Sequence, residues 1–346
     1  MKTISSESRV TVSTIHEVAA RAGVSLATVS RALNHPEKVK EETLRAVQLA
    51  ASELAYIPSA NARSLRKSRA ELIGVAVPSL SNPFFPALLE EASIEAERFG
   101  YSVLIKVDED PLQAAQVMER SDAVDGIVVV DNQWLIQEER RPVDFRLPVI
   151  AFDRVPSFDV LGTYQVDNTH GAYTVTKHLL SCGVKRLLHI SGPSGLDVSA
   201  KRQLGFERAV MNSGVEGLEV RIIEGDFTLE SGSGALAEAL RGDFMPQGIF
   251  AANDLMGIGA VQTAVNAGFS VPDDVKVGGF DDLVIAEFTV PSLTTYRQPI
   301  KAIAREAVCQ LLDLVSNRKV ESGGDRNTVH TFEGELIVRR STKNEG

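Results

Sequence analysis

The sequence predicts an all-α headpiece followed by an α/β core of two doubly wound parallel-sheet lobes. Three observations lead to this fold class. Residues 14–34, TIHEVAARAGVSLATVSRALN, have the apolar spacing of two short helices separated by a turn. From Leu72 onward, apolar strand runs alternate with helical stretches, which is typical of parallel sheets. These units occur in two sets, and 346 residues are more than one hydrophobic core usually holds.

The headpiece begins with a helix predicted over residues 15–21, with apolar side chains on one face. Gly23 follows, where the chain must turn sharply, and Ser25 is a suitable N-cap for the second helix. That helix should bury Val29 and expose Leu26, Ala27, Thr28, Ser30 and Arg31. A third helix is expected over residues 41–54. A short second helix with small and polar residues at its start suits the DNA major groove, although an ordinary αα-hairpin is the simpler alternative.

Two segments flank this headpiece, which we place at residues 14–57. Residues 1–13 are polar and are expected to form a flexible tail. Residues 58–70 are expected to form a hinge helix or linker, in which Ala62 and Leu65 favour helix and the basic residues have nothing obvious to pack against. A helix this short is not stable alone, so we expect it to order on DNA; a solvated linker is the alternative.

The core, residues 71–346, contains both sets of strands. Those of the first set are predicted at 72–77, 101–107, 126–130 and 148–153, and those of the second at 186–191, 219–225, 248–253 and 276–280. Helices are expected near 83–99, 171–181, 200–212, 229–241 and 255–267. We assign the N-terminal lobe to about 71–163 and 297–322, and the C-terminal lobe to about 164–296 and 323–342.

The charge distribution is uneven along the chain. The net charge is −10, but residues 1–69 hold 11 Lys and Arg against 6 Asp and Glu, whereas the remainder holds 25 against 40. A basic head keeps attraction for phosphate local, and the acidic body is best explained as aiding solubility. The two cysteines, Cys182 and Cys309, are far apart and predict reduced thiols in the cytoplasm rather than disulfides or a zinc site. No signal segment or membrane-spanning run of about 18 apolar residues is evident.

The headpiece string, YIPSANARSL and GFDD…PSLTTYRQP occur in an order that resembles the lactose-repressor/galactose-repressor family of transcriptional regulators, above all its ribose operon repressors. The similarity covers almost the whole chain after residue 13. It implies a periplasmic-binding-protein-like core that dimerises and binds a small-molecule effector between its lobes. It also implies a cytoplasmic homodimer that binds near-palindromic double-stranded operator DNA and has no membrane partner.

The resemblance assigns DNA-binding roles to particular residues. Base reading falls on Leu26 and Ala27, which offer only apolar contact, and on Arg31, which is suited to guanine. A minor-groove wedge falls on Leu65, preceded by Ala62, although Leu65 is also a plausible helix-packing residue. Phosphate contacts are expected from short polar residues, namely Thr14, Ser25, Thr28, Ser30 and Asn34.

The effector residues are expected just beyond the carboxyl ends of the strands, where open α/β lobes bind ligands. Carboxylates, arginines and amides there suit the hydroxyls of a sugar, and aromatic rings suit its C–H face. The set resembles the site of ribose-binding transport proteins, so we expect a pentose effector, ribose first: Asn82, Phe84, Phe85, Asp153, Arg154, Arg202, Phe227, Asn253, Asp281 and Gln298.

Each of these positions also has a purely structural explanation. Phe84 and Phe85 could be core, and Asn253 and Asp281 could be helix caps. Asp226, Asp254 and Asp282 are expected to be caps or to support the site. Leu196 and Val198 stand where relatives that bind purine bases have polar residues, which argues against a purine base. Nucleosides, hexoses and sugar phosphates remain alternatives.

Two other classes of protein fit the sequence less well. An enzyme is disfavoured because the GxGxxA string at residues 232–237 lies inside a predicted helix start, not at a tight strand–helix turn. The six histidines lack metal-ligand spacing. We therefore expect no catalytic residues, no metal and no cofactor. A transport-type sugar-binding protein without DNA function would fit the body, but the basic head and the missing signal segment argue against it.

Overall fold

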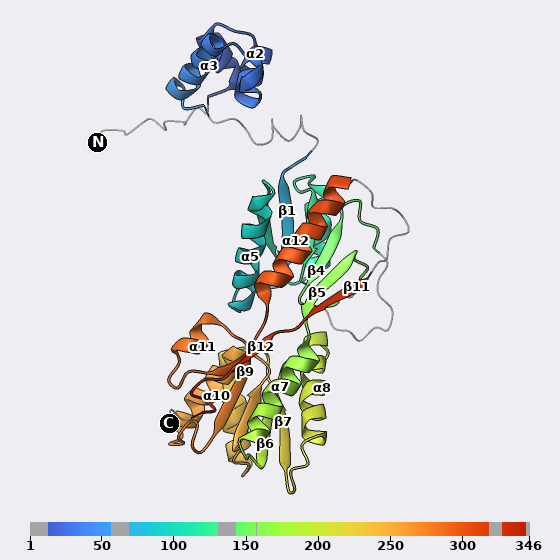
Figure 1. Cartoon of the computed structure of the whole chain (residues 1–346), viewed down its shortest axis with the longest axis vertical. Coiled ribbons are helices and arrows are strands. Elements are labelled where there is room, and N and C mark those ends of the chain that lie inside the picture. The colour runs from blue at the N-terminus through green and yellow to red at the C-terminus, as the bar shows by residue number, and fades with distance from the viewer. Residues whose placement is uncertain (1–12, 57–68, 131–142, 157, 318–326, 344–346) are drawn as a thin grey trace, which may run out of the picture. The chain divides into compact units, whose positions relative to one another are not determined.

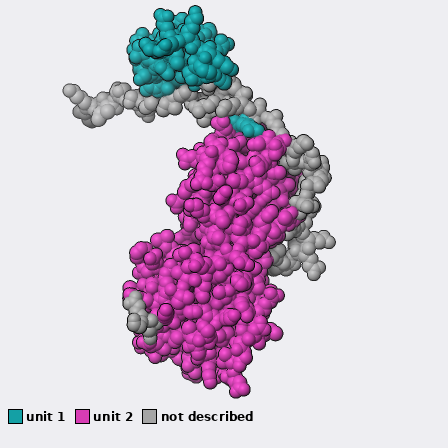
Figure 2. Space-filling view, viewed as in Figure 1, with its two compact units in different colours: residues 1–70 teal, residues 71–346 magenta. Residues whose placement is uncertain are grey.

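The computed structural model describes residues 13–56, 69–130, 143–156, 158–317 and 327–343. The chain divides into two compact units, residues 1–70 and residues 71–346 (Figure 2). Most of the tail and hinge segments predicted from the sequence, including Ala62 and Leu65, lies outside the described residues.

The described residues of the first unit form three α-helices, α1 (Ile15–Ala22), α2 (Leu26–Asn34) and α3 (Glu41–Glu53), with a 3₁₀ turn at Pro36–Lys38. Thr14 caps α1 through a reciprocal capping box with Glu17, and Gly23 ends that helix at φ +68°. Ser25 caps α2 by accepting a hydrogen bond from the Thr28 amide. Val18, Val29 and Val47, one from each helix, are fully buried against one another. The three predicted helices are confirmed.

The second unit contains two lobes, each with a six-stranded sheet (Figure 1). The sheet of the N-terminal lobe has the order β11-β5-β4-β3-β1-β2, and every neighbouring pair is parallel. Its elements are β1 (Leu72–Val77), α5 (Phe84–Arg98), β2 (Ser102–Val107), α6 (Pro111–Arg120), β3 (Gly126–Val129), β4 (Val149–Phe152), β5 (Gly162–Val166), α12 (Ile300–Asn317) and β11 (Thr328–Phe332).

The central strands of this sheet, β1, β3 and β4, are apolar throughout because helices cover both faces. Val75 and Val77 of β1 belong to the hydrophobic cluster that contains α5 and α12, whereas Ala76, between them, belongs to the cluster that contains α6. Alternation along a strand therefore sends successive side chains into two different cores. Such continuous apolar runs are what made the central strands predictable.

The C-terminal lobe repeats this arrangement with the order β12-β10-β9-β8-β6-β7, in which only the β10–β12 pair is antiparallel. Helices α7 and α8 cover one face, and α9 and α10 the other. The elements are α7 (Asn168–Ser181), β6 (Arg186–Ser191), α8 (Asp197–Met211), β7 (Glu219–Glu224), α9 (Leu229–Arg241), β8 (Gly248–Ala251), α10 (Asp254–Asn266), β9 (Lys276–Asp281), α11 (Val284–Phe288), β10 (Thr294–Arg297) and β12 (Glu335–Ile337). The predicted fold class is confirmed.

Between the described helices and strands, the chain crosses from one lobe to the other three times: after β5, before α12 and between β11 and β12 (Figure 1). The assignment of residues 323–342 to the C-terminal lobe is wrong for β11, which pairs with β5 in the first sheet. The N-terminal lobe also extends past residue 163, because β5 continues to Val166. Edge strands such as β11 are polar and partly exposed, so their sequence does not reveal which sheet they join.

Candidate functional site

The carboxyl end of β4 carries two of the expected effector residues. Asp153 and Arg154 follow the strand directly and are 6% and 8% exposed. Arg154 Nε donates to Asp153 Oδ2 at 3.1 Å. The other carboxylate oxygen, Oδ1, is buried and has no hydrogen-bond partner among the described atoms. A buried acceptor without a donor is costly, so this oxygen is a natural place for a ligand hydroxyl.

Three further residues of this lobe lie at the start of α5. Asn82 Oδ1 accepts a hydrogen bond from the Phe84 amide at 3.0 Å. Phe84 and Phe85 pack edge to face with ring centroids 5.5 Å apart, and the Arg154 guanidinium lies 5.8 Å from the Phe85 ring centroid. Both rings are 5% exposed and belong to the hydrophobic core. They therefore have a structural role, and their contact with a ligand stays a prediction.

A second group forms in the C-terminal lobe around Arg202 of α8. Arg202 Nη1 donates to the Ala252 carbonyl at 2.6 Å, and Nε donates to Asn168 Oδ1 at 2.8 Å. Its guanidinium lies 3.8 Å from the Phe280 ring centroid, and Nη2 lies 3.6 Å from Asp281 Oδ1. Gln298 Nε2 donates to the same Asp281 oxygen at 2.7 Å. The structure thus brings three predicted residues, Arg202, Asp281 and Gln298, into one buried network.

Electrostatic coupling joins the two groups. Burial raises the pKa of Asp281 to about 6, opposed by the charge of Arg202 and the Gln298 hydrogen bond and reinforced by the negative charge of Asp153. Burial likewise lowers the pKa of Arg202, against the attraction of Asp281 and then of Asp153. Asp153 comes from the first sheet and Asp281 from the second. Charged residues from both lobes therefore act on one another, as a single ligand site would require.

Phe227 and Asn253 contact each other near this network. Asn253 Oδ1 accepts from the Met256 amide as the N-cap of α10, and Asn253 Nδ2 donates to the Phe227 carbonyl, each at 3.0 Å. The cap interpretation of Asn253 is thus confirmed. The neighbouring residue, Ala252, supplies the carbonyl that Arg202 binds, which connects this pair to the Arg202 network.

Several residues at or just beyond these strand ends have a strained backbone with positive φ. Asp153, Phe227, Asp281 and Asp282 have φ of +64°, +68°, +115° and +57° and are four of the nine described non-glycine residues with positive φ. Such conformations cost on the order of 1–3 kcal/mol each and are common where a ligand is held. The strain independently marks the same positions as the sequence pattern.

Two residues of this region were missed by sequence reasoning. Asn168 is 1% exposed and accepts the Arg202 hydrogen bond, but it follows β5, a strand that the sequence did not reveal. Ser199 is 4% exposed, and its buried Oγ has no partner among the described atoms. A Cβ added at Gly192 would lie 2.5 Å from that Oγ and 2.2 Å from Phe227 Cζ, so Ser199 lies beside the Phe227 ring. An unpartnered hydroxyl has no sequence signal.

The headpiece presents part of the expected DNA-binding surface. Leu26 is 39% exposed, and Ala27 and Arg31 are also exposed. The hydroxyls of Thr14 and Ser25 serve as caps, and Thr28 Oγ1 lies 2.9 Å from Ser25 Oγ.

One residue of α2 differs from expectation. Ser30 is only 9% exposed, so its predicted exposure is wrong. It lies one helical step, about 100°, from Val29 and so at the margin of the buried face. The side chain of Asn34, like Ala62 and Leu65, lies outside the described residues.

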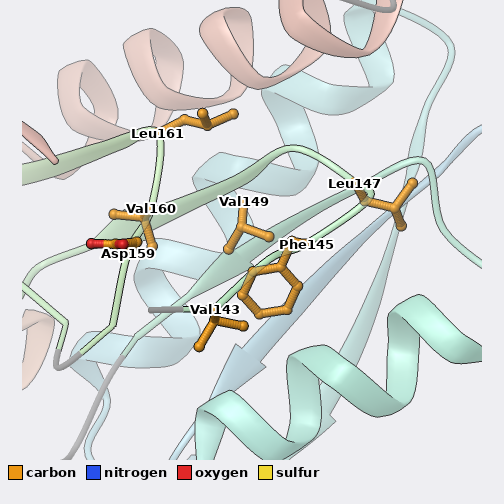
Figure 3. A pocket seen from close by; sticks show the side chains of 7 residues that line it. All are labelled: Val143, Phe145, Leu147, Val149, Asp159, Val160 and Leu161. Atoms are coloured by element: carbon orange, nitrogen blue, oxygen red, sulfur yellow. The ribbon is translucent and has the colours of Figure 1, made fainter. Parts of the chain in front are cut away.

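A small hollow in the N-terminal lobe is separate from these residues. It is lined mostly by apolar side chains, with one carboxylate, from Val143, Phe145, Leu147, Val149, Asp159, Val160 and Leu161 (Figure 3). These residues lie at the amino ends of β4 and β5, opposite to Asp153. Within the described ranges, no cluster of three or more potential metal ligands occurs. Among the helices described, none is long and apolar enough to cross a membrane.

Comparisons with known proteins agree with the structure of both the headpiece and the two-lobed core. Residues 14–59 match the model of bacterial regulatory proteins of the lacI family, and residues 176–342 match a periplasmic binding protein-like domain. The HTH-type transcriptional repressor CytR of Escherichia coli K12 is 33% identical over 342 residues, which cover 96% of this chain and 97% of that protein.

Two further similar proteins have names that mention a sugar. The ribose operon repressor of Halalkalibacterium halodurans is 31% identical over 335 residues, 96% of this chain and 98% of that protein. The structure of a periplasmic binding protein/LacI transcriptional regulator from Alkaliphilus metalliredigens, complexed with D-xylulofuranose, has a TM-score of 0.67 and 26% identity. It covers 79% of this chain and is itself covered completely.

Proposed function

Because the chain belongs to the lacI family of bacterial regulatory proteins and is a DNA-binding transcriptional repressor, we propose that the small molecule controlling it is a pentose, ribose first. The pentose would be held by the residues at the strand ends of the two lobes. The repressor acts as a homodimer in the cytoplasm on a near-palindromic operator.

The observation that carries this proposal is the buried, unpartnered Oδ1 of Asp153 near Asp281 and Arg202. Carboxylates accept hydroxyl protons, and neighbouring hydroxyls of a furanose or pyranose can donate to two carboxylates at once. Arg202 is already held by Asn168 and Ala252, so its direction is set before a ligand arrives. A site organised in advance loses little entropy on binding.

Further observations favour a sugar over a purine base. Leu196 and Val198, at the positions where purine-binding relatives have polar residues, are 6% and 2% exposed. They pack in the interior and offer no hydrogen-bonding side chain to a base. Two of the similar proteins have names that mention ribose or a five-carbon furanose.

Regulation follows from coupling between ligand and DNA. Each headpiece would occupy one half-site, and Leu65 of each hinge would enter the minor groove between them. The pentose would favour a closed arrangement of the lobes that moves the hinges out of position. The effect is limited to the differential affinity of the pentose for the two states. We therefore propose induction, in which the sugar releases the operator.

Calorimetry of the full-length protein with ribose, arabinose, xylose, glucose and uridine tests the effector. We expect heat of binding with ribose or another pentose. The absence of heat with every pentose would refute the proposal of a pentose effector. A gel shift with an operator-like palindrome tests the DNA function, with affinity falling steeply as salt rises. Adding the sugar that binds to the preformed protein–DNA complex should release the DNA. Tighter DNA binding in its presence would mean that the sugar is a corepressor and not an inducer.

A further inference from the structure

The turn that carries Asp281 is contacted by a buried carboxylate that is not among the candidate effector residues. Asp254, the first residue of α10, is fully buried. It does not cap α10, because Asn253 does. None of the described ion pairs includes it. Burial and the neighbouring Asp281 raise its pKa well above the usual value, so keeping a carboxyl group here costs stability.

Both carboxylate oxygens of Asp254 accept hydrogen bonds from residues that follow Asp281 in the chain. Oδ2 accepts from the Leu283 amide at 2.7 Å, and Oδ1 accepts from Thr295 Oγ1 at 2.5 Å. Thr295 Oγ1 in turn accepts from the Asp282 amide at 3.2 Å. One side chain thus reaches two successive amides, one directly and one through a hydroxyl.

The segment needs such support because its backbone is strained. Asp281 and Asp282 are consecutive residues with positive φ, +115° and +57°. The strand beneath leaves room for the carboxylate: a Cβ added at Gly279 would lie 2.3 Å from Asp254 Oδ1. Without the two anchors, the turn could relax and the Asp281 carboxylate would leave Arg202 and Gln298.

We propose that Asp254 is the positioning residue of the effector site: it holds the Asp281–Leu283 turn and thereby sets the direction of the Asp281 carboxylate. The proposal rests on the function proposed above only for its effect on sugar affinity. An aspartate is required because both contacts are made by acceptors, whereas asparagine offers one oxygen and one donor.

The first experiment needs no ligand. Amide hydrogen exchange of full-length Asp254→Asn is compared with the wild type and with Asp226→Asn, a matched control whose exposed carboxylate accepts from Thr228. Asp254→Asn should speed exchange at the Asp282 and Leu283 amides about tenfold or more, because the amide group replaces one of the two acceptor oxygens by a donor. The control should leave both amides unchanged. Unchanged protection in Asp254→Asn would overturn the proposal, whether or not a pentose binds.

The second experiment measures sugar affinity. Asp254→Asn should weaken binding about tenfold, and the double variant Asp254→Asn/Asp281→Asn should bind no more weakly than Asp281→Asn alone, since Asp254 acts through Asp281. Additive losses would indicate a general structural role and overturn the proposal. If Asp254→Asn does not fold, Thr295→Val against Thr295→Ser makes the same comparison, because only the valine removes the hydroxyl relay. Equal exchange and affinity in those two variants would then refute it.

Discussion

Replacing Arg202 by methionine should destabilise the ligand-free protein strongly. Arg202 is 4% exposed, and its guanidinium lies 3.6 Å from Asp281 and donates to Asn168 and Ala252. Removing one partner of a buried pair costs about 3–5 kcal/mol, because the other charge is left uncompensated. Methionine fills much of the volume over Phe280, so the loss should come from polar contacts rather than from a cavity.

Urea denaturation followed by circular dichroism measures this change. Arg202→Met should lower the free energy of unfolding of the core by about 4 kcal/mol. Arg208→Met is the matched control, since Arg208 is an exposed arginine of the same helix, and should stay within about 0.5 kcal/mol of the wild type. The double variant Arg202→Met/Asp281→Asn should recover part of the loss, because it removes the stranded carboxylate.

A loss below about 1 kcal/mol in Arg202→Met would refute this reasoning. It would mean that Asp281 either keeps its proton or finds water in place of the guanidinium. The network around Arg202 would then not be the preorganised part of the site, and the proposed sugar site would lose its main support in the C-terminal lobe.

Four further predictions concern pH and DNA. Burial raises the pKa of Asp281 to about 6, whereas an unfolded aspartate has a pKa of about 3.9. Between about pH 4 and 6 the unfolded chain therefore loses this proton first, and the stability due to Asp281 should fall by up to about 3 kcal/mol as pH rises. The free energy of unfolding of the wild type minus that of Asp281→Asn, measured against pH, isolates this effect. A difference that rises with pH would contradict the prediction. Sugar affinity should rise over about pH 5–7, because the ionised carboxylate accepts the hydroxyls. Leu65→Ala should keep the dimer and the sugar binding but weaken operator binding by well over tenfold in a gel shift; normal affinity would rule out the wedge. Arg31→Ala should reduce preference for operator over random DNA by roughly 5- to 150-fold, and an equal loss on both DNAs would show a phosphate contact instead.

Much of this protein was accessible from local sequence alone. Thr14, Gly23 and Ser25 mark the ends of α1 and the start of α2 through contacts within four residues. The residues that make these contacts are therefore neighbours in the sequence. The strands β1 and β6 were predicted to the residue because each is an apolar run covered on both faces. Polar residues at strand ends then indicated the candidate effector set, since parallel strands deliver their carboxyl ends to one edge.

Other features depend on which distant segments become neighbours, and only the tertiary structure decided them. The chain returns to the first sheet at β11 and then to the second at β12, a choice made by backbone pairing rather than by apolar pattern. Asn168 meets Arg202 only because β5 delivers it there. Asp254 follows an asparagine that caps the helix, and its own hydrogen bonds reach Leu283 and Thr295, 29 and 41 residues away. Helix caps and periodicity act over a few residues and can be derived from the sequence, whereas long-range hydrogen bonds require the folded chain.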